Sequence, residues 1–274
     1  MIAHSNYTNP LIARALFAAV LTLSSSAKSA DLPTFVDLPS GLIIGGHAGG
    51  KWLSSEQAGK ALEPGRKYRL FTLTGKTGDA VGGQAAPNAE VCPDVWEQTM
   101  QPTTEKSAIA LAVPWNPMPR TAKASDKTQE LYVKAARDFL VCKGIAKPVV
   151  KITQLLRIDL DGDGEDEVLL GATHYPGEEG ESPSQAEAGN YSFVLLRRVV
   201  DGKVQTKLVD GEFYPKTSES QTPYRYEVSG LLDLNGDGRL EIIIYSAYYE
   251  GATVTVWRFS AGKLNKVLEI GCGA

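Results

Sequence analysis

Two short segments of this 274-residue chain place carboxylate side chains at alternate positions, with glycines between them. The first runs from Asp159 to Glu167 and the second from Asp233 to Glu241. Calcium takes about six to eight oxygen ligands, and glycine lets a backbone curl tightly enough to bring alternate side chains onto one point. The chemistry that these residue types and this spacing predict is the binding of Ca²⁺.

The spacing assigns a ligand to every second position of each segment, with a backbone carbonyl at the fourth place. In the first loop, the expected ligands are Asp159, Asp161, Asp163, Glu165 (carbonyl) and Glu167. In the second loop, they are Asp233, Asn235, Asp237, Arg239 (carbonyl) and Glu241. Because the first loop offers four carboxylates and the second offers three with an amide, the first is expected to bind calcium more tightly.

Without a cation, the carboxylates within each loop repel one another. Two like charges about 4 Å apart cost roughly 1 kcal/mol in water and about 4 kcal/mol at an effective dielectric constant of about 20. A helical calcium loop needs a bidentate Glu at its twelfth position, where this chain has Leu170 and Ile244, so an EF-hand is not expected. The alternative interpretation is a turn rich in Asx and glycine whose carboxylates are solvated.

The segment DLDGDGEDEVLLGA (159–172) closely resembles the calcium loop and following strand of FG-GAP repeats, found in integrin alpha chains, and of related VCBS-type repeats in bacterial secreted proteins. The resemblance extends weakly over residues 149–274. It implies β-propeller-like blades, calcium held between strands, and a role in adhesion or recognition, sometimes as an accessory part of an enzyme. The chain departs from the family by having two evident copies and no clear FG-GAP tetrapeptide.

The elements that must position the loops are strands of a duplicated stretch. Residues 158–170 align without a gap on residues 232–244. Apolar alternating segments and a Gly-Lys turn follow in each copy, so 149–215 and 224–274 are each predicted to be a four-stranded antiparallel unit of propeller-blade size. Two units cannot close a ring, so they are expected to pack on each other or on the N-terminal part. The acidic, Pro- and Gly-rich insertion 176–188 is expected to be a surface loop, with a partner-binding loop as the alternative.

Residues 31–148 are predicted to be a mixed α+β region, which makes the fold mainly β overall. Ser54 and Gln57 have the spacing of a capping box at the start of a short helix. Strands are expected at 68–73 and 108–113, and the Gly- and Ala-rich residues 74–90 are expected to form an exposed loop.

The clearest helical pattern covers residues 126–143. Ser125 is the expected N-cap and Gly144 the expected C-terminal stop. The predicted buried stripe includes Leu131, Ala135 and Phe139 beside Tyr132, Ala136 and Leu140, and Cys142 is expected to lean toward it.

The first 30 residues have the layout of a secretory signal peptide, with Arg14, a short apolar run over residues 15–23 and a small-residue stretch ending at Ala30. The mature protein is therefore expected to be secreted or periplasmic, with no membrane span. Removing this segment leaves 26 basic and 32 acidic side chains, a net charge of −6 that disfavours nucleic acid as a partner.

Export exposes the three cysteines, Cys92, Cys142 and Cys272, to an oxidising compartment in which pairing is favoured. The sequence leaves all three pairings open. Cys92 with Cys142 is the preferred pair, and it would close a loop of 50 residues.

The sequence contains no hydrolase elbow, P-loop or dinucleotide fingerprint, and no His in a zinc-type spacing. His47, in the Gly-rich segment 45–50, is the one suggestive position, and an incidental His in a flexible turn is the favoured interpretation. His174 aligns with Tyr248 and is expected in a sheet. Several aromatic residues are candidates either for a ligand-stacking surface or for core packing: Trp52, Trp96, Trp115, Trp257, Tyr245, Tyr248 and Tyr249.

The function that these observations predict is an exported, calcium-stabilised, non-enzymatic module that binds a protein or glycan, with the segment around Tyr248 as the first place to look for a partner. The alternatives are an exported hydrolase whose site lies in the N-terminal half, with the repeats as a scaffold, and a purely structural envelope protein.

Overall fold

The computed structural model describes Met1 and residues 32–38, 40–88, 90–103, 108–176, 182–218 and 220–273. The predicted signal peptide, apart from Met1, and positions 177–181 of the acidic insertion lie outside the described residues.

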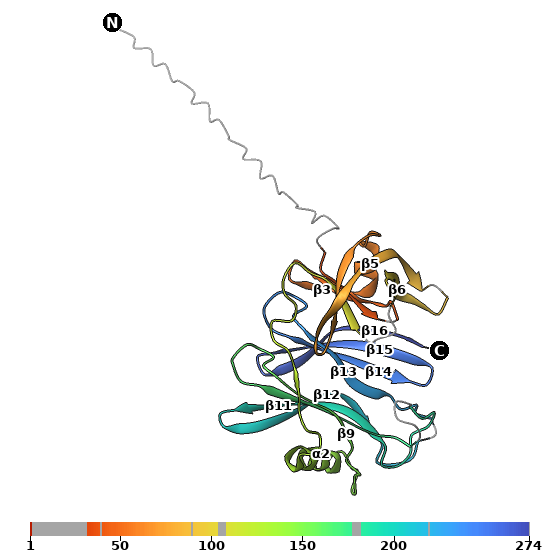
Figure 1. The fold of residues 1–274 in the computed structure, drawn as a ribbon, viewed down its shortest axis with the longest axis vertical. Coiled ribbons are helices and arrows are strands. Elements are labelled where there is room, and N and C mark those ends of the chain that lie inside the picture. The colour runs from red at the N-terminus through yellow and green to blue at the C-terminus, as the bar shows by residue number, and fades with distance from the viewer. Residues whose placement is uncertain are drawn as a thin grey trace.

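The chain is mainly β, as predicted, and its strands form antiparallel sheets (Figure 1). The strand order in the first sheet is β3-β2-β1-β7-β4-β5-β6. Its strands are β1 (Thr34–Leu38), β2 (Ile43–Ala48), β3 (Lys51–Leu53), β4 (Lys67–Thr72), β5 (Gly75–Asn88), β6 (Cys92–Gln101) and β7 (Ala108–Ala112). This sheet curls until Gln98 of β6 donates from its backbone to the carbonyl of Gly41, just before β2, and helix α1 (Ser55–Lys60) packs against it.

The second and third sheets come from the part of the chain that carries the acidic loops. The second has the order β12-β11-β10-β9-β8 and the third has the order β13-β14-β15-β16. The strands of the second sheet are β8 (Lys123–Ala124), β9 (Ile152–Ile158), β10 (Glu167–His174), β11 (Tyr191–Val200) and β12 (Lys203–Phe213). Those of the third are β13 (Arg225–Leu232), β14 (Glu241–Tyr248), β15 (Gly251–Ser260) and β16 (Lys263–Gly273).

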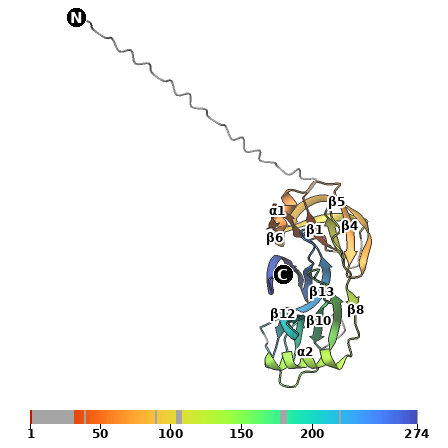
Figure 2. The same ribbon diagram turned by 90° about the vertical axis from the view of Figure 1, so that its left-hand side faces the viewer.

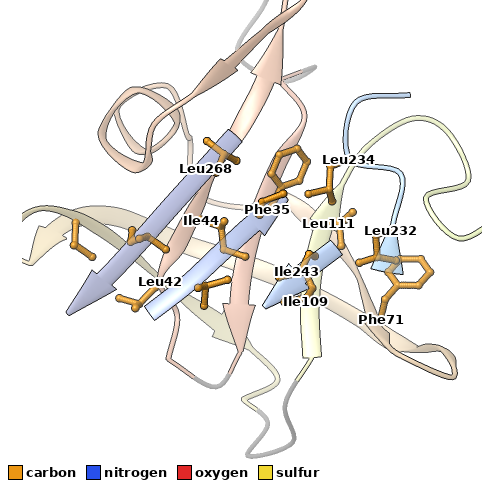
Figure 3. Close-up of a cluster of buried hydrophobic side chains, with 14 residues drawn as sticks. Phe35, Leu42, Ile44, Phe71, Ile109, Leu111, Leu232, Leu234, Ile243 and Leu268 are labelled. Atoms are coloured by element: carbon orange, nitrogen blue, oxygen red, sulfur yellow. The ribbon is translucent and has the colours of Figure 1, made fainter. Parts of the chain in front are cut away.

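The sheets stack in layers, with the third sheet between the first and the second (Figures 1 and 2). One face of the third sheet meets the first sheet in a cluster that includes Phe35, Leu111 and Ile243 (Figure 3). The other face meets the second sheet, and helix α2 (Glu130–Cys142) covers the outer face of the second sheet. Burying each large apolar side chain stabilises the fold by about 1.5–3 kcal/mol, so these interfaces tie the layers together.

Strands β10 and β14, which follow the two acidic loops, are central in their sheets as predicted. Leu169 and Leu170 are fully buried and belong to clusters on opposite faces of β10. Ile242 and Ile243 are divided between two clusters in the same way. Burial on both faces explains why these strands are continuous apolar runs and do not alternate with polar residues. The second sheet has one strand more than predicted because β8, which precedes α2, pairs with β9.

The expected loop at 74–90 is wrong, because residues 75–88 form strand β5, which pairs with both β4 and β6. Its glycines lie where neighbouring side chains leave no room. A Cβ on Gly82 would stand 2.6 Å from the Gln98 side chain, and one on Gly83 would stand 2.3 Å from the hydroxyl of Thr99. The small residues therefore serve close strand packing here and do not mark a turn.

The two helix predictions have different outcomes. The capping box of Ser54 and Gln57 is present at the start of α1. Helix α2 begins at Glu130, later than expected, because Asp126 accepts hydrogen bonds from the backbone and hydroxyl of Thr128 and makes a local turn. Its buried residues are Tyr132, Ala136 and Leu140, whereas Leu131 and Cys142 are exposed, so the predicted positions of those two side chains are wrong.

The preferred cysteine pairing is also wrong. Cys92 of β6 is bonded to Cys272 of β16, with their Cα atoms 5.8 Å apart, and Cys142 is a free, exposed thiol. The reason is the layering, because α2 covers the second sheet, whereas β6 and β16 contact each other across the first and third sheets. The disulfide therefore joins the first and third sheets through two cysteines that are 180 residues apart in the sequence.

Candidate metal centre

The two acidic loops connect equivalent strands and lie against each other. The first joins β9 to β10 and the second joins β13 to β14. The backbone N–H of Leu240, at the end of the second loop, donates to the carbonyl of Leu160 in the first over 2.8 Å. The sequence-predicted sites therefore form one continuous acidic region at one end of the second and third sheets.

In the first loop, Asp159 shapes the backbone. Its two carboxylate oxygens accept from the N–H groups of Gly162 and Gly164, over 2.6 and 3.1 Å. Both glycines have positive φ angles, 82° and 90°, which residues with a Cβ rarely adopt. The turn thus depends on the alternation of Asp and Gly that the sequence shows.

Three of the five predicted ligands of the first loop come together. Carboxylate oxygens of Asp159, Asp161 and Glu167 lie within 4.8 Å of one another. Glu167 is buried, and burial raises the pKa of its carboxyl group, although the Leu160 N–H donates to it. Asp163 and Glu165 lie at the exposed tip, where the Asp163 carboxylate accepts from the Glu165 N–H. One buried oxygen of Asp161 accepts no hydrogen bond, so it is available to a cation.

The second loop repeats this backbone geometry. The carboxylate of Asp233 accepts from the N–H groups of Gly236 and Gly238, over 2.7 and 2.9 Å, and Glu241 accepts from Leu234 over 2.9 Å. Glu241 is fully buried, and burial raises the pKa of its carboxyl group to about 8.

The remaining predicted ligands of the second loop are arranged around Asp237. The Asn235 side chain accepts from the Asp237 N–H, and the Asp237 carboxylate accepts from the N–H of the exposed Arg239. Within the described ranges, only the first loop brings three acidic ligand atoms within 4.8 Å.

A connecting segment between β7 and β8 contacts both loops, and sequence reasoning missed it. The Arg120 guanidinium donates to the carbonyls of Asp159, Leu160 and Gly238, over 2.5, 3.2 and 2.7 Å. Trp115 donates from its indole to the Asp233 carbonyl over 2.9 Å. These contacts join positions 39 to 118 residues apart in the sequence, so no local pattern could have revealed them.

The other residues singled out in the sequence lie in two places. His47 packs against Trp52, with ring centroids 4.9 Å apart. Burial lowers the pKa of His47, and the charge of Arg258 lowers it further, which places His47 near the second loop. Trp96, Trp257 and Tyr245 are partly buried and pack against the core, as the core-packing interpretation expects. Trp115 is also partly buried, and its ring lies beside Gly236 of the second loop.

Tyrosines gather at the other end of β14 from the second loop. The rings of Tyr224 and Tyr248 are 4.8 Å apart, and Tyr249 stands edge-on to Tyr248 at 5.7 Å with 54% of its surface exposed. Below them, the Glu212 carboxylate accepts from the hydroxyls of Tyr214 and Tyr226 and from the Tyr224 N–H, over 2.5, 3.1 and 3.1 Å. His174 packs against Tyr191 at the end of β10, which agrees with its expected place in a sheet.

The N-terminal half contains a cavity of about 1100 Å³ beside strands β4, β5 and β7. Charged groups of both signs line it, among them Arg69, Lys67, Asp79 and Glu63. Arg69 is engaged with the backbone carbonyls of Val113 and Trp115, so it also holds the start of the connecting segment.

No family model matches the sequence, and no match is found among curated proteins or solved structures. Neither of the helices in the described ranges has the length and apolar character needed to cross a bilayer.

Proposed function

We propose that this chain is an exported, calcium-stabilised binding module. The observation that carries the proposal is the cluster of three carboxylates formed by Asp159, Asp161 and Glu167. Their ligand atoms lie within 4.8 Å of one another, on a backbone that two glycines allow to turn tightly. Three carboxylates this close repel one another unless a cation neutralises them. Calcium fits because the donors are all oxygen atoms and two of the three side chains are held by backbone N–H groups.

The ligand set would be completed by groups that the loop keeps nearby. Asp163 and the Glu165 carbonyl are the remaining candidates in the first loop, and water can fill positions that the protein leaves open. In the second loop the candidates are Asp233, Asn235, Asp237, the Arg239 carbonyl and Glu241. When bound, calcium would supply positive charge that holds β9 against β10 at the loop, so its role is structural.

The loop-and-strand pattern supports assigning the two units to blades of FG-GAP or VCBS type. The supporting geometry is that each loop enters the central strand of an antiparallel sheet. A pair of such units, one of them packed on the first sheet, would serve recognition and not ring closure. Arg14 and the apolar run over residues 15–23 support export to the periplasm or the exterior.

The tyrosine group of Tyr224, Tyr248 and Tyr249 is the surface where we place a protein or glycan partner. Aromatic rings with one exposed edge supply large contact areas at little cost in side-chain entropy. The group lies away from the loops, so calcium would stabilise the sheet that presents it without touching the partner.

A hydrolase with its site in the N-terminal half is the second candidate. The cavity of about 1100 Å³ favours it, because it is large enough for a small-molecule substrate. An activity panel of ester, glycoside and peptide substrates would test this candidate. A glycan array or a pulldown tests the binding module.

The calcium proposal is tested by titrating the purified mature protein with CaCl₂ in a calorimeter and by following its melting temperature. Extracellular modules typically bind calcium with a dissociation constant of about 0.1–1 mM. The melting temperature is expected to rise with calcium and much less with magnesium, which demands near-octahedral geometry and releases water reluctantly. Absence of calcium binding up to several millimolar would contradict the proposal.

A further inference from the structure

Each acidic loop faces an arginine on the strand that pairs with its central strand. Val168 of β10 pairs with Arg197, so Arg198 lies one position nearer the first loop. Ile242 of β14 pairs with Trp257, so Arg258 has the corresponding place beside the second loop. The two loops therefore have the same arrangement of elements and can be compared side chain by side chain.

In the second loop, the arginine contacts the acidic side chains directly. The Arg258 guanidinium donates to the carboxylate of Asp237, and its Nε lies 3.8 Å from Oε1 of Glu241. That Glu241 oxygen is buried and accepts no hydrogen bond, while the other accepts from Leu234. A positive charge thus stands beside two of the three carboxylates of this loop, and the third, Asp233, is taken up by two backbone N–H groups.

In the first loop, the equivalent residue Arg198 lies at the margin of the carboxylate cluster and not among the carboxylates. Arg198 lies 4.0 Å from an Asp161 oxygen, and its guanidinium lies over the ring of Phe259, 4.9 Å from the centroid. Arg120 lies 3.9 Å from an Asp159 oxygen while it donates to backbone carbonyls, so the first loop has arginines at its margin, whereas Arg258 donates directly to a carboxylate of the second loop. The aromatic face of Phe259 stabilises the Arg198 guanidinium in its place. The three ligand atoms of Asp159, Asp161 and Glu167 remain close together, and one Asp161 oxygen accepts no hydrogen bond.

The second loop also carries less negative charge than the first, which likewise makes it less suited to bind a metal cation. Where the first loop has Asp161, the second has the neutral Asn235, whose amide donates to Asp237 over 3.3 Å. A calcium ion entering the second loop would have to break the ion pair between Arg258 and Asp237 and approach a guanidinium of the same sign. Two positive groups this close oppose one another by an amount that grows as water is excluded.

We propose that Arg258 is the built-in cation of the second loop: its guanidinium takes the place of a divalent ion beside Asp237 and Glu241, so only the first loop needs calcium. Arg258 thereby decides which loop binds metal. The part of this inference that concerns the first loop rests on the proposed function, whereas the role of Arg258 does not.

The test counts calcium ions bound by the mature chain in calorimetric titrations. The unsubstituted protein is expected to bind one ion, and Arg258→Gln is expected to bind two, with the affinity of the second loop raised about tenfold, which corresponds to about 1.4 kcal/mol. Arg258→Lys keeps the charge and is expected to bind one. The matched control is Arg198→Gln, the same substitution at the corresponding position, which should leave the number at one.

The double variant Asp161→Asn/Arg258→Gln assigns the new ion to the second loop. It is expected to bind one ion, whereas Asp161→Asn alone binds none below about 1 mM. If the unsubstituted chain binds no calcium but Arg258→Gln binds one, the proposed function of the first loop fails while the role of Arg258 stands. If Arg258→Gln and the unsubstituted protein bind the same number with the same affinity, the inference is overturned.

Loss of folding in Arg258→Gln also gives a decision. Recovery of the native circular dichroism spectrum with 10 mM calcium, about ten times the upper dissociation constant for such sites, would mean that the metal replaces the guanidinium, as proposed. A variant that stays unfolded at that concentration would show that Arg258 acts through packing and not as a cation, which would overturn the proposal.

Discussion

At the scale of single residues, position three of each loop distinguishes the two sites. Asp161 belongs to the cluster of three carboxylates in the first loop. Asn235, in contrast, donates to the side chain of Asp237 and accepts from its N–H. Removing a charged ligand weakens a cation site more than removing an amide that is occupied elsewhere.

We therefore expect Asp161→Ala to abolish most of the calcium-dependent rise in melting temperature and Asn235→Ala to leave most of it. Calcium at ten times its dissociation constant stabilises one site by about 1.4 kcal/mol, which sets the size of the loss. Differential scanning calorimetry with and without calcium measures it. Equal losses in the two variants would mean that the ligand assignment is wrong.

Asp37 offers a test of buried charge that is independent of the loops. It is 3% exposed, and burial raises the pKa of its carboxyl group to about 6, although the Ser40 hydroxyl donates to it. Between pH 3.8, the ordinary pKa of an Asp carboxyl group, and a pH of about 6, the folded state binds more protons than the unfolded state. The stability therefore falls as the pH rises through this window.

Replacing Asp37 with Asn is expected to remove that dependence, because the amide keeps an acceptor for Ser40 and carries no charge. The free energy of unfolding should change by about 2 kcal/mol less between pH 4 and pH 6 than in the unsubstituted protein. Urea denaturation at a series of pH values measures this. Parallel stability curves for the two proteins would show that Asp37 is not the titrating group.

At the scale of elements, the sequence predicted correctly those structures that hydrogen bonds between near neighbours in the chain form. The loops at 159–167 and 233–241 were predictable because their Asp and Gly residues bond to one another within five positions. The capping box of Ser54 was predictable for the same reason. Strand β5 was missed because its glycines are required by side chains of β6 that pack against them from up to 16 residues away. The residues of β5 therefore show no local pattern typical of a strand.

The close packing of β5 gives a prediction with a matched control on the same strand. An added Cβ at Gly82 would meet the side chain of Gln98, which is buried and held by the Tyr68 hydroxyl, whereas at Gly78 the nearest atom is 3.9 Å away on Leu70. Gly82→Ala is expected to lower the free energy of unfolding by about 1–3 kcal/mol, and Gly78→Ala to leave it nearly unchanged. Chemical denaturation compares them.

If residues 75–88 were instead an exposed loop, the two substitutions would have the same small effect. A difference below about 0.5 kcal/mol would therefore argue against the tight pairing of β5 with β6, since surface substitutions fall within that range.

At the scale of the whole molecule, the layering decided what the sequence could not. Arg120 reaches both loops only because the segment after β7 passes from the first sheet to the second along the side of the third. Likewise, Cys92 meets Cys272 only because β6 and β16 face each other across the cluster of Phe35, Leu111 and Ile243 between the first and third sheets. Contacts of this kind follow from how sheets stack, and a single sequence carries no separate signal for them.

The disulfide between Cys92 and Cys272 is expected to contribute to stability by holding the first sheet on the third. In the chain-entropy model, a link between cysteines 180 residues apart restricts the unfolded chain by about 5 kcal/mol, and loss of a native disulfide typically costs about 2–5 kcal/mol. Cys92→Ser/Cys272→Ser should therefore melt several degrees lower than the oxidised protein. Cys142→Ser is the control, and it should melt like the unsubstituted chain because this thiol is free and exposed.

Thiol counting on the unfolded, unreduced protein gives the complementary measurement. One reactive thiol is expected in material from an oxidising compartment, and Cys142→Ser should have none. Calcium binding to the first loop should survive loss of the disulfide, because that loop is held by its own glycines and by Arg120, which lie outside the linked strands. Three thiols in the native protein, or two thiols in Cys142→Ser, would mean that Cys92 and Cys272 do not pair. The first sheet would then be held on the third by non-covalent contacts alone.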